Sequence, residues 1–187
     1  MIVLIPIGEV EETVLKNLRH SLAKVFKQEA KIGSAMAPPK RRWYEPRGKY
    51  LVSVVLAAIP RPTHPGDRSL GVIDVDLFAP GLNFVFGEED VSGGRAVISL
   101  WRLRPEFYGL PSDENLFQER AVKEAVYQLG LTYGLEQCPD SACVMHFSNR
   151  LDDIDVKAWY FCSRCREKWR GQWSGGSIIE EGSDESM

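Results

Sequence analysis

The four cysteines of this 187-residue chain constrain its fold more than any other feature. All of them lie between residues 138 and 165, in the order Cys-x4-Cys, a gap, and Cys-x2-Cys. Two close pairs joined by a loop can wrap one tetrahedral ion, because each pair spans one edge of the tetrahedron. A shell of four thiolates leaves no position for water or substrate, so such a site stabilises a fold and does not catalyse. The sequence therefore predicts one structural zinc ion, with the ligands Cys138, Cys143, Cys162 and Cys165.

Other interpretations of the cysteines are weaker. Two disulfides would suit an oxidising compartment, but the start of the chain makes a poor secretion signal, since Pro6 and Glu9 interrupt its apolar run and no basic residue precedes it. We therefore expect a cytoplasmic, reducing location. Four unrelated buried thiols would not cluster so tightly, and iron is the main competing metal for an all-thiolate site.

Composition indicates one globular domain. The chain is 44% hydrophobic and 26% charged, which is ordinary for a protein that buries a core without cross-links. Its net charge of −3 gives no overall field that would attract nucleic acid or an acidic membrane. No apolar run approaches the roughly 20 residues that a membrane-spanning helix needs. We expect a monomer with no membrane partner.

Hydrophobic periodicity predicts strands and helices in alternation. The predicted strands are short apolar runs between turn residues, at 1–7, 70–78, 83–86 and 95–103. The predicted helices have apolar stripes at helical spacing and cover residues 11–27 and 116–133. Ser112 or Asp113 is expected to cap the second helix, and Gly134 to follow its end. Residues 50–59 are compatible with either a strand or a helix.

This order favours a single α/β or α+β domain. We expect a sheet-and-helix part at residues 1–134 and a small, irregular subdomain with the structural zinc at residues 135–174. Residues 175–187 are rich in Gly, Ser, Glu and Asp, and are expected to form a disordered acidic tail.

The stretch from Lys123 to Cys138, followed by Cys143-Val-Met145, resembles the signature of the archaemetzincins, which are metzincin-type zinc metalloproteases. That signature is HExxHxxGxxHC, then x4-C-x-M and a distal CxxC. Gly134, Met145 and the four cysteines fall on this pattern, although the gap before the distal pair is slightly short. Residues 71–77, 80–87 and 97–103 resemble the family's sheet. The resemblance implies a metzincin-like domain with a mixed twisted sheet, two long helices and a zinc-bearing C-terminal subdomain.

The chain departs from the family at every catalytic position. Tyr127, Leu131 and Gln137 stand where the family has three zinc-binding histidines, and Gln128 replaces the general-base glutamate. Leu131 has no donor atom, and the amide of Gln128 cannot accept a proton near neutral pH. We therefore predict that the chain binds no catalytic zinc and does not cleave peptides.

Few other residues could rebuild that chemistry. The three histidines, at positions 20, 64 and 146, are not spaced as a ligand pair, and His146 is expected to be structural or exposed. Glu124 lies one helical turn before Tyr127 and Gln128. It could be a lone carboxylate in the cleft, but we expect a surface charge.

The resemblance also implies an edge strand above the active-site helix that pairs with an extended peptide or unfolded segment. Here its residues would be Asn83, Phe84, Val85 and Phe86. Backbone pairing needs no metal, so peptide binding can outlast catalysis. Proteolysis through an unconventional metal site remains an alternative.

Basic residues raise a further alternative, in which the zinc-bearing subdomain binds nucleic acid or protein. Every second residue from 164 to 170 is basic, namely Arg164, Arg166, Lys168 and Arg170, and Trp159 and Trp173 flank this run. Basic side chains beside aromatic rings can contact phosphates and stack on bases. The acidic overall charge disfavours nucleic acid. The loop at 35–48, with Lys40, Arg41 and Arg42, is expected to be solvated and not an anion contact.

Overall fold

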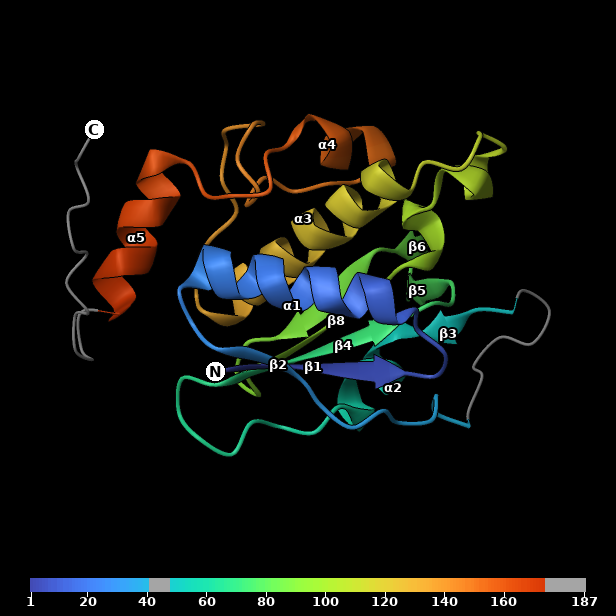
Figure 1. The fold of residues 1–187 in the computed structure, drawn as a ribbon, viewed down its shortest axis with the longest axis horizontal. Coiled ribbons are helices and arrows are strands. Elements are labelled where there is room, and N and C mark those ends of the chain that lie inside the picture. The colour runs from blue at the N-terminus through green and yellow to red at the C-terminus, as the bar shows by residue number, and fades with distance from the viewer. Residues whose placement is uncertain (41–47, 174–187) are drawn as a thin grey trace, which may run out of the picture.

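Two sheets and two long helices make up the body of the protein (Figure 1). The computed structural model describes residues 1–40 and 48–173. The five-stranded sheet has the order β2 (Ala30–Ile32), β1 (Ile2–Ile7), β4 (Arg68–Ile73), β8 (Arg95–Ser99) and β7 (Gly87–Asp90). Its first four strands are parallel, and β7 runs antiparallel to β8 at one edge. The mixed α/β domain that the sequence predicts is confirmed.

A second, three-stranded sheet has the order β3 (Tyr50–Leu51), β5 (Leu77–Ala79) and β6 (Leu82–Val85). It leaves β6 at an edge, where β6 leads directly into β7. The predicted strand at 83–86 therefore corresponds to β6 and the residue after it.

Helices cover both faces of the larger sheet. α1 (Glu12–Phe26) and α3 (Glu114–Thr132) lie side by side over one face, and α2 (Val52–Ala58) covers the other (Figure 1). Alternate residues of β1 follow this division, with Ile2 and Leu4 in one apolar cluster and Ile5 and Ile7 in the other. Burial on both faces is what a parallel sheet requires, and it explains the continuous apolar sequence of the strand.

Both long helices lie within two residues of their predicted bounds, and of the two caps that the sequence allows for α3 the structure has Asp113. The side chain of Asp113 accepts a hydrogen bond from the backbone N–H of Leu116 at 3.0 Å, so it is the N-cap of α3. Gly134, just beyond the end of α3, has a φ of +83°, a conformation that favours glycine.

Three predicted elements differ from the structure. The predicted strand at 70–78 is wrong as one element, because β4 ends at Ile73 and β5 begins in another sheet at Leu77. Between them, Asp74 and Asp76 bind Arg104 and Arg102, and such charged pairs do not continue a buried strand. The predicted strand at 95–103 stops at Ser99 and continues as a short 3-10 helix, η2 (Trp101–Leu103). Residues 50–59 form β3 and then α2.

The end of the chain is more ordered than the sequence indicates. Residues 135–174 are not simply irregular, because they contain α4 (Leu151–Val156) and α5 (Ser163–Trp173). The other elements that the pattern misses are β2, β7 and a second 3-10 helix, η3 (Pro105–Tyr108). Arg41 and Arg42 and the predicted acidic tail lie outside the described residues.

The segment after α3 folds back against that helix. The N–H of Leu135 donates to the carbonyl of Gly130 at 3.0 Å, and the N–H of Cys138 donates to the carbonyl of Met145 at 2.9 Å. Met145 is fully buried, and a Cβ atom on Gly130 would lie 2.5 Å from its Sδ atom. A side chain at position 130 would therefore push Met145 away from the helix.

We predict that Gly130→Ala destabilises the protein. Alanine favours a helix over glycine by about 1 kcal/mol, but overpacking a tight core costs about 1–3 kcal/mol, so the free energy of unfolding should fall. In a Met145→Ala background the nearest remaining neighbour is Leu135 Cδ1 at 3.6 Å, and there Gly130→Ala should stabilise. Urea unfolding of the parent, the two single variants and the double variant measures the change in the free energy of unfolding that Gly130→Ala causes in each background. Stabilisation of the parent by Gly130→Ala would contradict this packing.

Candidate metal centre and adjoining cleft

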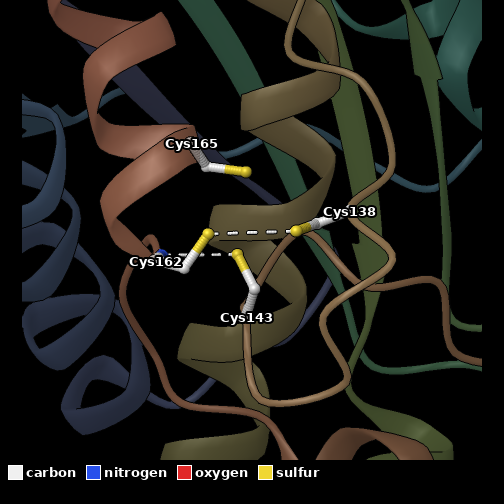
Figure 2. Close-up of side chains that lie close together, drawn as sticks. All are labelled: Cys138, Cys143, Cys162 and Cys165. Atoms are coloured by element: carbon white, nitrogen blue, oxygen red, sulfur yellow. Dashed lines mark hydrogen bonds between the residues drawn. The ribbon is translucent and has the colours of Figure 1, made fainter.

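The four cysteine sulfurs come together beside the C-terminal half of α3 (Figure 2). Cys138 and Cys143 lie in the segment after α3, while Cys162 precedes α5 and Cys165 lies in its first turn. The four Sγ atoms lie within 4.8 Å of one another, and those of Cys138 and Cys162 are 3.9 Å apart. Zinc bonded to four thiolates at 2.3 Å requires sulfur atoms about 3.8 Å apart. All four thiols are free, so the cluster fits a zinc ion.

Nearby donors favour thiolates at this cluster. Burial works against ionisation of Cys138, but a hydrogen bond from Arg164 to its Sγ at 3.3 Å helps to lower its pKa to about 7. The backbone N–H of Cys162 donates to the Sγ of Cys143 at 3.4 Å. Burial raises the pKa of the Cys143 and Cys165 thiols. A bound cation would offset that cost, because metal binding releases the thiol protons.

Aromatic packing holds α5, and with it Cys165, against the domain. Trp169 of α5 is buried, and its ring centroid lies 5.3 Å from that of Phe26 and 4.8 Å from that of Tyr133. Basic residues of α5 bind within the chain: besides Arg164 on Cys138, Lys168 forms an ion pair with Glu136 at 2.8 Å. The tryptophan is therefore a core residue and not a free stacking surface.

His146 has a structural contact. Its Nδ1 lies 2.8 Å from the backbone carbonyl oxygen of Cys138, and its own carbonyl accepts a hydrogen bond from Lys157 Nζ at 2.9 Å. The histidine therefore braces the cysteine segment, as the sequence predicts.

A cleft of about 420 Å³ lies next to the cysteine cluster. One wall is the chain from residue 82 to residue 89, which comprises β6 and most of β7. The opposite wall is α3 together with the segment after it, and it contributes Glu124, Tyr127, Gln128, Leu131, Gln137, Phe147, Ser148 and Asn149. The structure thus brings the predicted peptide-binding residues, 83–86, to the same cleft as the four degenerate catalytic positions.

The side chains at those four positions do not offer the donors of a three-histidine zinc site. Gln137 Nε2 donates a hydrogen bond to the hydroxyl of Tyr127 at 3.2 Å, so the first and third former ligand positions are bonded to each other. Burial raises the pKa of Tyr127, which keeps its oxygen a phenol and not a phenolate. Leu131 supplies no ligand atom. The donor set therefore does not fit a catalytic zinc ion.

Glu124 is not the surface charge that the sequence favours. It is 3% exposed, and its Oε1 accepts a hydrogen bond from Gln128 Nε2 at 2.8 Å. Burial raises the pKa of Glu124, while the positive charge of Lys157 and the bond from Gln128 lower it. The sequence misses this because a helix of low amphipathicity gives no sign of which polar residues point inward.

Lys157, Glu88 and Glu89 also escape the sequence analysis. Lys157 is 2% exposed, and its Nζ lies 4.7 Å from the ring centroid of Tyr127. Burial lowers the pKa of Lys157 and raises those of Glu88 and Glu89. The two glutamates directly follow a predicted strand, which is the one signal that could have assigned them to the cleft.

Comparison with known proteins agrees with this geometry. The model of Peptidase family M54 matches residues 65–170. Archaemetzincin of Methanocaldococcus jannaschii is 40% identical over 87% of this chain and 89% of its own length, and that of Pyrococcus furiosus is 42% identical over 90% and 91%. The chain belongs to the archaemetzincin family. Crystal structures of archaemetzincins from Archaeoglobus fulgidus, complexed with malonate, and from Methanopyrus kandleri superpose with TM-scores of 0.77 and 0.79. These two are 36% and 34% identical to this chain, covering 90% and 92% of it and 99% and 94% of their own lengths.

Cys138, Cys143 and Met145, which fall on the archaemetzincin pattern, lie in the segment that folds back against α3. Zinc is the metal of this family of peptidases, and the buried cysteine cluster can bind one such ion. No helix in the described part of the chain is both long and apolar enough to cross a membrane.

We predict that the cysteine cluster stabilises the fold through one zinc ion per chain. A ligand at about 1,000 times its Kd stabilises the folded state by about 4 kcal/mol, so Cys165→Ser should lose much of its zinc and melt at a lower temperature. Ser141→Ala, a change at an exposed residue of the same region, is the control and should keep the zinc content and the melting temperature of the parent. Zinc content by mass spectrometry and thermal unfolding test this. A Cys165→Ser protein that binds zinc and melts like the parent would contradict it.

Proposed function

We propose that this archaemetzincin has no catalytic zinc and does not hydrolyse peptides, and that its cleft binds extended peptides. The observation that carries the first part is the hydrogen bond between Tyr127 and Gln137, the first and third former ligand positions. Hydrolysis by this family's chemistry needs imidazole ligands and a carboxylate base. Here Gln128 holds the base position, and its amide is engaged by Glu124.

Peptide binding is supported by the strand that forms one wall of the cleft. β6 is an edge strand, and an edge strand can pair its backbone with an added chain. Phe84 and Phe86 contact each other along this wall, with ring centroids 5.2 Å apart, and exposed Phe147 lies on the opposite one. Apolar walls beside an open strand suit an extended segment.

The two alternatives have less support. Proteolysis through another metal site needs a second ligand cluster, and across residues 1–40 and 48–173 the cysteines are the one group at metal spacing. A nucleic-acid-binding role for α5 would use Arg164 and Lys168, which are bound to Cys138 and Glu136. A monomer in a reducing, cytoplasmic setting completes the proposal, since the cluster requires reduced thiols.

Restoring the family residues should restore a second zinc site. The variant Tyr127→His/Gln128→Glu/Leu131→His/Gln137→His is expected to bind two zinc ions per chain, where the parent binds one. The matched control keeps Leu131 and changes the other three, and it should bind the second ion far more weakly because one imidazole is missing. Native mass spectrometry counts the ions. A parent protein with two zinc ions and chelator-sensitive peptide cleavage would overturn the proposal.

Extended peptides should perturb the edge strand. Titration with a peptide library is expected to shift the backbone amide resonances of residues 82–88 in two-dimensional NMR spectra. Peptides with N-methylated backbone amides should bind more weakly, because they cannot donate to the strand. If no library member shifts these resonances, or if methylated peptides bind equally well, the β6 edge does not pair with peptides.

A further inference from the structure

The charged residues that line the cleft all have the same sign. Among residues 1–40 and 48–173 they are Glu88 and Glu89 of β7 and Glu124 of α3, and this described part of the lining includes no Lys, Arg or His. Three cations lie beside the lining in the described chain. The ammonium of Lys157 faces Glu124, near the ring of Tyr127, and donates to a backbone carbonyl. Lys49 donates to the carbonyl of Asn83 and Arg102 covers the ring of Phe84, and both of these pair with Asp76.

Side chains alternate along a strand, so Glu89 points the same way as the Cβ direction of Gly87, toward Gln128, and Glu88 points the other way. Around Gln128 the carboxylates of Glu89 and Glu124 face the covered ammonium of Lys157, which leaves this part of the cleft negative. A concave site of one sign attracts ligands of the opposite sign.

The Glu88 and Glu89 carboxylates of β7 have no basic partner among the residues described, whereas Asp90 at the end of the same strand binds Arg95. Neither Glu88 nor Glu89 forms a side-chain ion pair in the described chain, although both are only partly exposed. Burial raises the pKa of Glu89, and so do the charges of Glu88 and Glu124. Gly87, two residues earlier on the same face of β7, lies against Gln128 of α3, so the Glu89 side chain points toward the helix that carries Glu124. A cation between Glu89 and Glu124 would relieve the repulsion of their charges.

An unpartnered acceptor gives an independent sign of a ligand. Gln128 is 4% exposed, lines the cleft, and uses its Nε2 for the bond to Glu124, while its Oε1 has no hydrogen-bond partner among the described residues. Ser148 Oγ on the same wall is also buried without a partner. A buried acceptor without a donor is costly, so an occupant that supplies N–H groups would stabilise this wall.

Aromatic and aliphatic side chains make up much of the remaining lining, and they favour a particular kind of cation. Phe84 and Phe86 form one side, and Leu131 and Phe147 the other. The three carboxylates are not a metal cluster, since the cysteines are the one group in the described chain whose ligand atoms gather closely enough. A lysine or arginine side chain can lay its methylene groups along the apolar walls and place its charged end on the carboxylates.

We propose that the cleft binds extended peptides through a lysine or arginine side chain, with its stem between the aromatic walls and its N–H groups on Glu89, Glu124 and Gln128. This proposal rests on the peptide binding proposed above, and it adds a preference for peptides that contain lysine or arginine. The three Lys or five Arg donors match the unpartnered acceptors, and the charge matches the carboxylates. Acidic and neutral side chains would leave the carboxylates unpaired.

The test is a set of short blocked peptides that differ only at one central residue, which is Lys, Arg, norleucine or Glu. Isothermal titration of the full-length protein should give Lys or Arg binding at least about tenfold tighter than norleucine, a difference of about 1.4 kcal/mol. The advantage should shrink as salt is added, because exposed charge pairs are screened. The Glu peptide should bind most weakly.

Glu89→Gln should remove most of the advantage of the Lys peptide and leave norleucine binding unchanged. Glu29→Gln makes the same charge change on an exposed residue beside β2, at the far edge of the sheet, and should leave the Lys advantage intact. Equal binding of all four peptides would overturn the charge preference while peptide binding stands. If none of the peptides binds and the library also fails, the proposed function falls with it.

Discussion

The burial of α3 on all sides is the constraint on which the rest of the structure depends. From Arg120 to Gly130 every residue of this helix is buried, including four that are charged or amide-bearing. A polar group without water must find a partner in the protein. Arg120 therefore binds both carboxylate oxygens of Asp155 at 2.7 Å, and Lys123 reaches the backbone carbonyl of that same residue at 3.1 Å. These bonds fix α4 over the helix and so shape the chain around the cleft.

The same helix carries the metal centre and the cleft on neighbouring surfaces. Met145 packs onto Gly130, which holds the segment between Cys138 and Cys143 in place. On the cleft side, polar side chains bond to each other: Gln137 to Tyr127, and Gln128 to Glu124. The structural half of the family site is independent of these bonds, because its four ligands lie outside the helix.

Sequence reasoning succeeded where a local rule applies. Two short cysteine pairs, the cap at Asp113 and the glycine at 134 each depend on a few neighbouring residues. It failed where long-range contacts decide the outcome. Asp74 and Asp76 interrupt a predicted strand only because Arg104 and Arg102 reach them from elsewhere in the chain. Glu124 is buried because other elements, α4 and β7 among them, pack against α3. When a helix is covered on every side, its sequence does not show which polar residues are buried.

One metal ion is expected to bind to the cysteines and none to bind in the cleft. Anomalous diffraction at the zinc absorption edge, from crystals grown with excess zinc, tests this expectation most directly. The account predicts one strong peak among the sulfurs of Cys138, Cys143, Cys162 and Cys165, with the hydrogen bond between Tyr127 and Gln137 intact. A second zinc peak beside Tyr127 would contradict it.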